Sequence, residues 1–463
     1  MGNQRTKILI IAIGLLAFAG TILFTGGNSL FWNAIAVGGI MIYFWILEVI
    51  PIYLTALIPI IVSGPLGLLD IDGKIDASIL AKSYGNHMVY IFLGGFMLAL
   101  ALEKWGIHVQ IARRILRIIG RSKSRIILGF MISTAILSMW VSNTATALML
   151  LPMALAVIRS LPEQEQGSKF SLFLILSIAY GASIGGVGTL VGSPPNLQMA
   201  SILSKNYGIE IDFLHWSMIG FPICCLMILL AYGYILIALG KERKEEVHQF
   251  SLEKDSWNKY QIRVLIVFLI VVFLWCFKGP IGALGFAYRD DNVAILGALL
   301  LFLVPAETGK NLLEWQDTQK LPWGILLLFG GGLALADTLK RGGVIDWLTN
   351  SLAGLSELPY ALLLLLIIAI ALFATEIISN LALVTLMVPV MAAFAEEFGF
   401  PILQICVPIT LASSFAFMLP ISTPPNAIVF SSGQITIRKM AKTGFLLNLI
   451  GMILIFAMSW ILL

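Results

Sequence analysis

The amino-acid sequence predicts an all-α, polytopic membrane protein with about eleven transmembrane helices and two re-entrant hairpins. Of its 463 residues, 59% are hydrophobic and only 12% are charged, and the mean hydropathy is +0.96. Soluble domains are roughly half apolar and a quarter charged, so a soluble fold is excluded. The net charge is only +4. The basic residues lie in short clusters between apolar segments, which indicates membrane topology and disfavours a nucleic-acid partner.

Apolar segments of the length that crosses a bilayer, about 20 residues, recur along the chain. The first follows Arg5 and Lys7, and it lacks a small-residue cleavage site, so we interpret it as a membrane helix and not as a signal peptide. The eleven predicted spans cover residues 8–25, 30–48, 50–68, 88–103, 170–204, 213–239, 260–277, 292–305, 322–339, 400–430 and 443–463. Tryptophans near span ends are expected to be interface anchors; they are Trp45, Trp105, Trp216, Trp275 and Trp460.

Two further apolar stretches predict the hairpins. Between Arg125 and Arg159 lie 33 uncharged residues, too many for one ordinary span and too few for two. Because both flanks are basic, both ends are expected on the cytoplasmic side, with the tip near Ser142. Residues 358–395 form a comparable stretch between acidic flanks. This second stretch predicts a hairpin that enters from the opposite face.

The charge distribution along the chain predicts its orientation. Basic clusters at 113–125, 241–244 and 438–442 are expected on the cytoplasmic side, and the acidic loop at 70–76 outside. This places a multi-pass chain in the cell's inner membrane with a cytoplasmic N-terminus. Residues 107–121 mix apolar and basic residues at helical spacing, which is typical of a helix lying along the membrane surface.

An internal repeat relates the two halves of the chain. Residues 92–104, FLGGFMLALALEK, match residues 329–341, FGGGLALADTLKR, at an offset of 237. The same offset carries the Ser-Asn pair at 142–143 onto the Ser-Asn pair at 379–380. With five spans and one hairpin before the pattern recurs, the two halves are predicted to have opposite orientations. Inverted repeats of this kind are typical of secondary transporters.

Two double-proline motifs predict broken helices at equivalent repeat positions. GSPPN at 192–196 and STPPN at 422–426 interrupt apolar segments at an offset of 230. Proline lacks a backbone donor and disfavours helix in the residue before it, while Ser193 or Thr423 is a suitable N-cap for a new half-helix. A single motif of this kind is often a structural kink. Its recurrence favours a site at the membrane centre, facing the positive ends of two helices.

The hairpin tips carry short polar residues, Ser-Asn-Thr at 142–144 and Ser-Asn-Leu at 379–381. Hydroxyl and amide groups at a helix interruption can donate to a carboxylate and can supply oxygen ligands to a hard cation. One such tripeptide could equally be an interhelical contact, but its recurrence in two hairpins favours a binding site. Glu376 is expected to orient the second tip or to tune a cation site.

The predicted site elements contain almost no charge. Residues 126–158, 170–204 and 398–437 have no Lys, Arg, Asp or Glu, and the second hairpin has only Glu376. Half-helix ends supply roughly half a positive charge each, which falls short of the two negative charges of a dicarboxylate. Co-bound cations would make up the difference, provided that no basic side chain reaches in from a neighbouring helix.

Two other classes of function remain as alternatives. A channel would need a continuous pore ringed by charges or carbonyls, whereas hairpin tips that meet at the membrane centre suit alternating access. An enzyme would need a nucleophile with a base, or a metal cluster. The four histidines are scattered, the four cysteines show no CxxC spacing, and no histidine lies within the predicted site segments.

Four segments together resemble the divalent anion sodium symporter family, which transports succinate, malate, fumarate and related acids: SMWVSNTATALMLLP, SIGGVGTLVGSPPN, ATEIISN and AFMLPISTPPNAIVF. The resemblance covers nearly the whole chain. It implies a homodimer in the lipid bilayer that works by an elevator mechanism, with sodium as a co-transported ion. The scaffold would comprise residues 1–124 and 241–357, and the moving transport domain residues 125–240 and 358–463.

The resemblance also implies roles for individual residues. The first sodium site would comprise Ser138, Ser142, Asn143 and Gly192, and the second Thr375, Ile378, Asn380 and Ser422, partly through backbone oxygens. Substrate carboxylates would contact Asn143, Thr144, Ser193, Asn380 and Thr423.

One residue departs from the family pattern. Leu381 stands where many members have threonine, and it would present an apolar surface to the substrate. The departure bears on substrate preference and on coupling to the second cation. Sodium-coupled symport is the favoured function, and sodium-independent exchange of dicarboxylates is the alternative.

Overall fold

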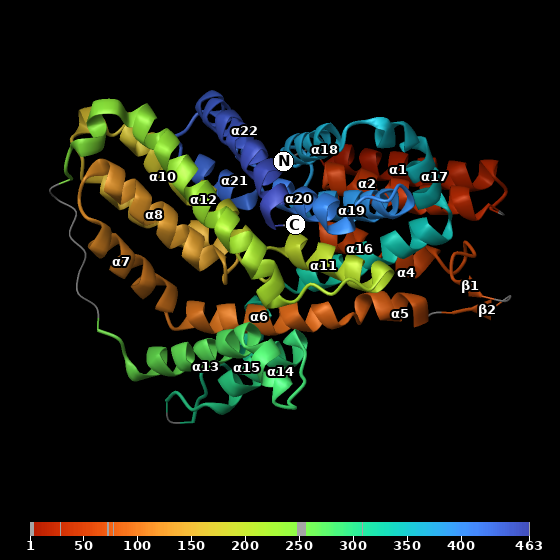
Figure 1. Cartoon of the computed structure of the whole chain (residues 1–463), viewed down its shortest axis with the longest axis horizontal. Helices are drawn as coiled ribbons and strands as arrows, with labels where there is room; N and C mark the ends of the chain where they lie inside the picture. The colour runs from red at the N-terminus through yellow and green to blue at the C-terminus, as the bar shows by residue number, and fades with distance from the viewer. Residues whose placement is uncertain are drawn as a thin grey trace.

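The computed structural model describes residues 4–27, 29–71, 74–76, 78–247, 256–307 and 309–462. The described residues are mostly helical (Figure 1). Their strands form one antiparallel pair in the predicted acidic loop, β1 (Asp70–Ile71) and β2 (Lys74–Ile75). Positions 72 and 73 of that loop lie outside the described residues.

The helices of the first half are, in chain order, α1 (Gln4–Phe24), α2 (Leu30–Leu47), α3 (Ile52–Thr55), α4 (Ile58–Val62), α5 (Ser78–Tyr84), α6 (His87–Lys104), α7 (Ile107–Ile119), α8 (Lys123–Ser138), α9 (Asn143–Arg159), η1 (Glu163–Glu165), α10 (Lys169–Val187), α11 (Pro194–Tyr207), α12 (Phe213–Leu239) and η2 (Gly240–Lys244).

Those of the second half are α13 (Lys259–Cys276), α14 (Lys278–Ala283), α15 (Asp290–Leu303), η3 (Trp315–Lys320), α16 (Trp323–Arg341), α17 (Val344–Ser351), η4 (Ala353–Glu357), α18 (Tyr360–Ala374), α19 (Asn380–Glu397), α20 (Ile402–Ser414), α21 (Pro424–Ser431) and α22 (Ile437–Leu462).

Nine helical segments among the described residues are long and apolar enough to span a bilayer. Eight coincide with predicted spans, and the ninth, α19, is an arm of the second hairpin. The predicted span at 50–68 is wrong, because an interruption at residues 56–57 divides it into the short helices α3 and α4, with Pro59 in the first turn of α4. The predicted span at 292–305 is α15, which has only 14 residues and falls short of a full crossing.

Both predicted hairpins and both predicted helix breaks are present. Helices α8 and α9 turn at residues 139–142, and α18 and α19 turn at residues 375–379. The break between α10 and α11 lies at 188–193, and the break between α20 and α21 lies at 415–423.

The sequence repeat is matched by a repeat of structure. Helix α7 begins at residue 107 and α17 at residue 344, again 237 positions apart. Each is preceded by a glycine in the left-handed conformation, Gly106 with φ 66° and Gly343 with φ 70°, which residues with a Cβ rarely adopt. Helix α7 is the predicted surface helix, and it buries Ile107, Ala112 and Leu116.

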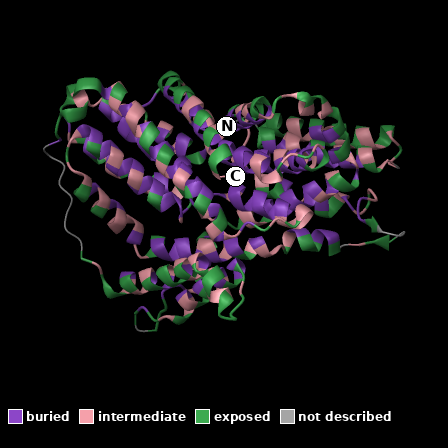
Figure 2. Cartoon of the chain, viewed as in Figure 1, coloured by how far each residue is buried: buried purple, intermediate pink, exposed green. Residues whose placement is uncertain are grey.

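The broken helix lies inside the protein and the first helix lies at its edge. Helix α10 packs against α8, α9 and α12, and 94% of its most apolar stretch is buried, against 6% for α1 (Figure 2). Figure 1 shows α8, α10 and α12 running side by side, with α13 and α15 packed beneath α6.

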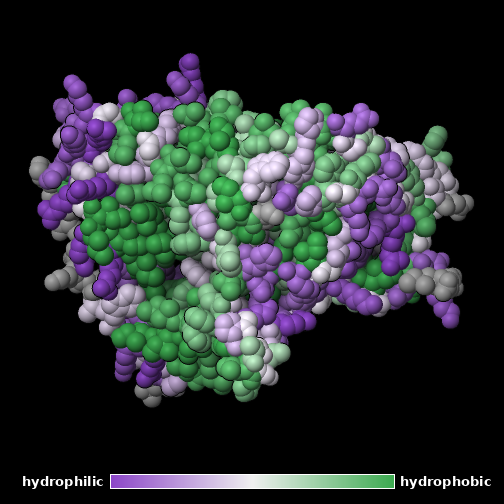
Figure 3. Space-filling model, viewed as in Figure 1, coloured by the Kyte–Doolittle hydropathy of each residue, from purple (hydrophilic) through white to green (hydrophobic). Residues whose placement is uncertain are grey.

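The protein surface carries broad apolar areas. Exposed leucines, isoleucines and phenylalanines lie along α12 and α13, among them Leu229, Ile237, Leu269 and Phe273. Figure 3 shows broad apolar areas over the helices, interrupted by hydrophilic side chains that lie at the edges and also across the middle of the face. Such a surface suits contact with lipid.

The prediction that the span-end tryptophans are interface anchors is wrong for three of them. Trp45, Trp216 and Trp275 are buried, at 4%, 0% and 1% exposed. Each indole N–H donates to a backbone carbonyl, that of Ile52, Val187 or Asp290, at 2.9–3.0 Å. A buried indole needs such a partner, so these rings serve packing.

Candidate functional site

A cavity of about 220 Å³ lies where the two hairpin tips meet the two helix breaks. This volume is small beside the roughly 300–1,000 Å³ of sites for drug-sized ligands, so it suits a small molecule. Its described lining residues are Phe92, Gly95, Phe96, Trp140, Val141, Ser142, Asn143, Thr144, Val191, Gly192, Ser193, Pro194, Pro195, Ile325, Ser379, Asn380, Leu381, Ser422, Thr423, Pro424 and Pro425.

All six residues predicted to contact substrate line this cavity: Asn143, Thr144, Ser193, Asn380, Leu381 and Thr423. Of the residues assigned to sodium by resemblance, Ser142, Asn143, Gly192, Asn380 and Ser422 line it as well. Ser138 and Thr375 lie directly behind it, hydrogen-bonded to Asn143 and Asn380. Ile378 is not a lining residue, and its side chain packs in an apolar cluster with Leu381.

Four helices begin at the cavity. The N-caps are Ser142 for α9, Ser193 for α11, Ser379 for α19 and Thr423 for α21. Ser142, Ser379 and Thr423 accept a hydrogen bond from the backbone N–H three residues on, as expected of a cap. Ser193 has the extended backbone of a cap without this bond. The positive ends of four helix dipoles are therefore directed at one small volume.

The hydrogen-bond donors in the cavity come from the hairpin helices more than from the broken ones. Prolines occupy the first two positions of α11 and α21, and these positions carry no N–H. In α9 the first two amides belong to Asn143 and Thr144, and in α19 to Asn380 and Leu381. None of these four has an acceptor among the described residues. Leu381 thus still offers its backbone N–H, although its side chain has no hydroxyl.

The cavity has polar ends and apolar walls. None of its described lining residues is Lys, Arg, His, Asp or Glu, so within the described part of the chain no basic side chain reaches into the cavity from a neighbouring helix. Apolar side chains complete the wall, namely Phe92, Phe96, Trp140, Val141, Val191, Ile325 and Leu381. A ligand with two anionic ends and a short apolar middle matches this distribution.

The helix ends change the charge balance expected from the sequence. Two half-helices would supply about one positive charge, whereas four N-termini supply roughly two. This total is similar to the charge of a dicarboxylate. Charge balance alone therefore does not require sodium, and any case for sodium has to come from oxygen groups suited to a cation.

Such oxygen groups occur behind both hairpin tips, in the same arrangement. Ser138 Oγ lies 2.5 Å from Asn143 Oδ1 and 2.8 Å from the Ala182 carbonyl oxygen. Thr375 Oγ1 lies 2.9 Å from Asn380 Oδ1 and 2.6 Å from the carbonyl oxygen of Ser413.

A hydroxyl has one proton and can donate to only one acceptor at a time. Each group of three oxygens is therefore short of protons. Oxygen-rich sets of this kind suit a hard cation such as Na⁺. The carbonyls of Ala182 and Ser413 could not be predicted from the sequence, because every residue carries a backbone oxygen and none leaves a sequence signal.

Glu376 holds the second helix break together. Its carboxylate is 3% exposed and accepts hydrogen bonds from the backbone N–H groups of Phe417, Met418 and Leu419 at 2.9–3.2 Å. It also accepts from Ser422 Oγ at 2.5 Å.

A fifth donor reaches this carboxylate from α22, where Asn448 Nδ2 lies 2.8 Å from Glu376 Oε1. The equivalent position in the first repeat is Met139, whose carbonyl accepts from Thr189 Oγ1 at 2.5 Å. Glu376 therefore orients the break that carries Ser422, and only the second repeat has this carboxylate.

Comparison with known proteins identifies related sequences along the whole chain. Residues 6–463 match the family model described as the sodium:sulfate symporter transmembrane region. A sodium-dependent dicarboxylate transporter, SdcS, of Staphylococcus saprophyticus is 36% identical over 97% of this chain and 90% of its own length. The protein of the same name in Staphylococcus aureus strain USA300 is 34% identical over the same shares.

Two solved structures share the fold. The YdaH transporter of Alcanivorax borkumensis superposes with a TM-score of 0.61 at 14% identity, over 85% of this chain and 90% of that one. MtrF of Neisseria gonorrhoeae, described among antimetabolite efflux pumps, gives a TM-score of 0.59 at 13% identity, over 85% of both chains. At these identities the likeness concerns the fold alone.

Proposed function

The chain belongs to the divalent anion sodium symporter family, and on this premise we propose that it carries C4 dicarboxylates such as succinate, malate and fumarate into the cell together with sodium. It is a multi-pass membrane transporter and not an enzyme. The observation that carries the proposal is the uncharged cavity enclosed by four helix N-termini, with an oxygen cluster behind each hairpin tip. The Staphylococcus relatives are named as sodium-dependent dicarboxylate transporters, which supports both the substrate and the coupling ion.

Transport in proteoliposomes tests the proposal directly. Labelled succinate should enter empty vesicles when an inward sodium gradient is imposed, and potassium should not replace sodium. The same vesicles loaded with unlabelled succinate, without a sodium gradient, test the alternative of exchange. If uptake depends only on the internal succinate, the protein is an exchanger and not a sodium symporter.

We further propose an elevator mechanism in which residues 125–240 and 358–463 move against residues 1–124 and 241–357. Several contacts lie on this boundary. Lys205 of α11 pairs with Asp337 of α16, and Ser83 of α5 lies 2.9 Å from the Lys205 ammonium and 3.0 Å from the Asp337 carboxylate. A rigid-body displacement would have to separate this ion pair.

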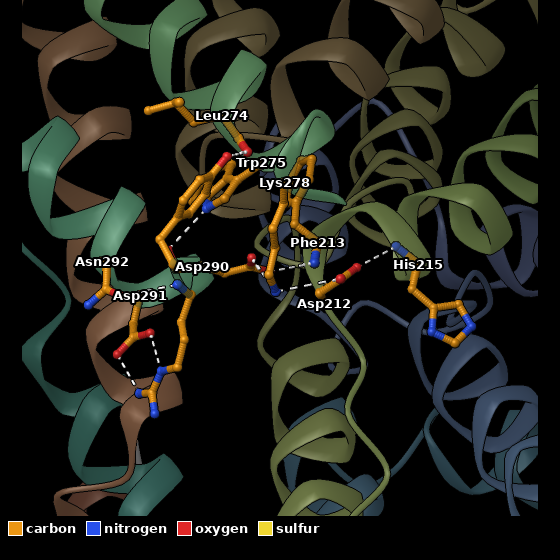
Figure 4. Close-up of polar contacts among 11 residues, drawn as sticks. Asp212, Phe213, His215, Leu274, Trp275, Lys278, Asp290, Asp291 and Asn292 are labelled. Carbon is orange, nitrogen blue, oxygen red and sulfur yellow. Dashed lines mark hydrogen bonds and ion pairs between the residues drawn. The ribbon is translucent and has the colours of Figure 1, made fainter. Parts of the chain in front are cut away.

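A second polar contact joins α12 to the segment 278–291 on the same boundary (Figure 4). Asp290 is 5% exposed, accepts from the backbone N–H of Phe213 at 2.7 Å and pairs with Lys278 at 3.1 Å. Lys278 also lies 3.6 Å from Asp212. The ring of Phe213 stacks on Trp275, with centroids 4.6 Å apart. This more buried contact would have to pivot or break during transport.

Cross-linking across the boundary should stop transport. In a cysteine-free background, Lys205→Cys combined with Asp337→Cys should lose uptake when a bifunctional thiol reagent joins the two residues, because the two parts can then no longer separate. A cleavable reagent should restore uptake on reduction. The matched control is Lys104→Cys with Asp317→Cys, a 2.6 Å ion pair within the proposed scaffold. Full uptake by the cross-linked 205–337 pair would contradict the elevator proposal.

Leu381→Thr should shift substrate preference toward hydroxylated acids. The new hydroxyl would add a donor to the cavity, so malate should compete with labelled succinate roughly 3- to 10-fold better than it does in the wild type. Leu381 also belongs to a buried apolar cluster that includes Ala56 and Leu328, so a slight loss of stability is expected. Thr144→Leu, at the equivalent position of the first repeat, is the converse control. An unchanged malate-to-succinate ratio would remove Leu381 from substrate selection.

Two further features of the proposal rest on the family resemblance and on charge distribution. The resemblance supports a homodimer, and the mass of the purified protein in detergent tests it. The basic clusters at 113–125, 241–244 and 438–442 support an inner-membrane protein with a cytoplasmic N-terminus. Reporter fusions at the two ends test this orientation.

A further inference from the structure

Two buried asparagines lie behind the cavity, one at each helix break. Asn196, in the first turn of α11, is fully buried, and its Nδ2 donates to the carbonyls of Gly186 and Thr189, both at 2.9 Å. Asn426, in the first turn of α21, is also fully buried. Its Nδ2 donates to the carbonyls ten and seven residues before it, both at 3.0 Å. The separations of ten and seven residues are the same in both repeats.

These hydrogen bonds give a donor to backbone carbonyls at the two helix breaks. The last carbonyls of a helix have no partner within it, and the two prolines that follow each break supply no N–H. One proton of each side-chain amide binds a carbonyl that has no backbone donor among the described residues, Gly186 or Ala416, and the other joins a backbone N–H at the carbonyl of Thr189 or Leu419. The amide thereby ties the start of α11 to the last turn of α10, and the start of α21 to the break that follows α20, and fixes the width of each gap.

In the first repeat this tie reaches a cavity residue. Gly186 packs so closely on the side-chain amide of Asn143 that a Cβ at Gly186 would lie 3.0 Å from it. A Cβ at Gly192 would lie 2.7 Å from the Gly186 carbonyl oxygen. Asn196 therefore binds the carbonyl of Gly186, and Gly186 is the residue on which the Asn143 side chain packs.

We propose that Asn196 and Asn426 are positioning residues, which hold the two helix breaks at the width where the cavity binds sodium and substrate. This inference rests on the proposed function. Neither asparagine lines the cavity, so each acts through the backbone that it holds and not by contact with a ligand.

The chain contains a matched control outside the cavity. Asn33 of α2 is 1% exposed, and its Nδ2 donates to the carbonyls of Gly27 and Leu66, both at 2.9 Å. Its Oδ1 is buried without a partner among the described residues, as are those of Asn196 and Asn426. The three asparagines thus make the same bonds, but only two of them join the halves of a broken helix.

Replacement of each asparagine by aspartate separates positioning from stability. Aspartate keeps the shape of the side chain but places an acceptor against two carbonyl oxygens, so both hydrogen bonds are lost. The measurement is the melting temperature of the purified full-length protein as a function of sodium concentration, with succinate present. Asn33→Asp should lower the melting temperature and leave the half-saturating sodium concentration within about twofold of the wild type.

Asn196→Asp and Asn426→Asp should raise the half-saturating sodium concentration about tenfold or more, because two hydrogen bonds that set the site are removed. If either aspartate variant does not fold, the smaller Asn→Ala change at the same position is measured in its place. An unchanged sodium midpoint at both positions, with a normal response of the wild type, would overturn the positioning role alone. A wild type that sodium does not stabilise would overturn the proposed sodium coupling itself.

Discussion

Asn143→Ala should reduce sodium-driven succinate uptake more than roughly 100-fold while leaving the protein folded. The side chain is a member of the first oxygen cluster, 2.5 Å from Ser138 Oγ, and it lines the cavity at the N-terminus of α9. Loss of groups that merely support a metal ligand already costs 10- to 100-fold in affinity, and here a proposed ligand itself is removed. Initial uptake rates into proteoliposomes with matched protein content give the measurement.

Two comparisons show whether this loss is specific. Asn380→Ala, at the equivalent position of the second repeat, should behave in the same way. Asn258→Ala removes an asparagine that caps α13 by accepting from the backbone N–H groups of Tyr260 and Gln261. It should cost about 1 kcal/mol of stability and leave uptake intact. Normal uptake by Asn143→Ala would refute the site assignment.

Glu376→Leu should destabilise the fold by about 3–5 kcal/mol. The substitution leaves three backbone amides and the Asn448 amide without their acceptor, whereas the Ser422 hydroxyl can still donate to the backbone carbonyl of residue 376, 3.0 Å away. Each unsatisfied buried group costs about 1–3 kcal/mol, although local rearrangement recovers part of the sum. A clear fall in melting temperature and in the yield of monodisperse protein is the expected result.

Glu376→Gln refines the test, because it keeps the shape and one acceptor oxygen. It should fold better than the leucine variant but shift the sodium dependence of uptake, since Ser422 would no longer be held by a carboxylate. Met139→Leu, at the equivalent position of the first repeat, is the control, with an expected cost below about 1.5 kcal/mol. If Glu376→Leu were as stable as Met139→Leu, the carboxylate would not be what holds the second break.

Local signals in the sequence account for much of the fold. A double proline cannot lie inside a regular helix, so the breaks at 188–193 and 415–423 were predictable, and the hairpin tips followed from the length of two nearly uncharged stretches and from their charged flanks. The wrong prediction at 50–68 has a related cause. Hydropathy averaged over a segment does not register Pro59, which lies in the first turn of α4, just after the interruption at residues 56–57.

The three buried tryptophans show what a local sequence signal cannot determine. A tryptophan that faces lipid and one that is buried can both lie near the end of a span. The contacts of the ring with residues distant in sequence distinguish the two. Trp216, for example, meets the carbonyl of Val187, 29 residues away.

The sequence by itself determined the membrane class, the repeat and the interruptions, because each depends on composition or on neighbouring residues, and its resemblance to a known family indicated the six residues expected to contact substrate. Only the tertiary structure decided that four helix N-termini meet, that Glu376 joins the second break, and that the carbonyls of Ala182 and Ser413 complete the oxygen clusters. The residues that make the backbone contacts of Glu376 and of the oxygen clusters are 38 to 46 positions apart in the sequence. Their partners are backbone atoms that every residue carries, so the choice among them is made by packing and is not written in side-chain identity.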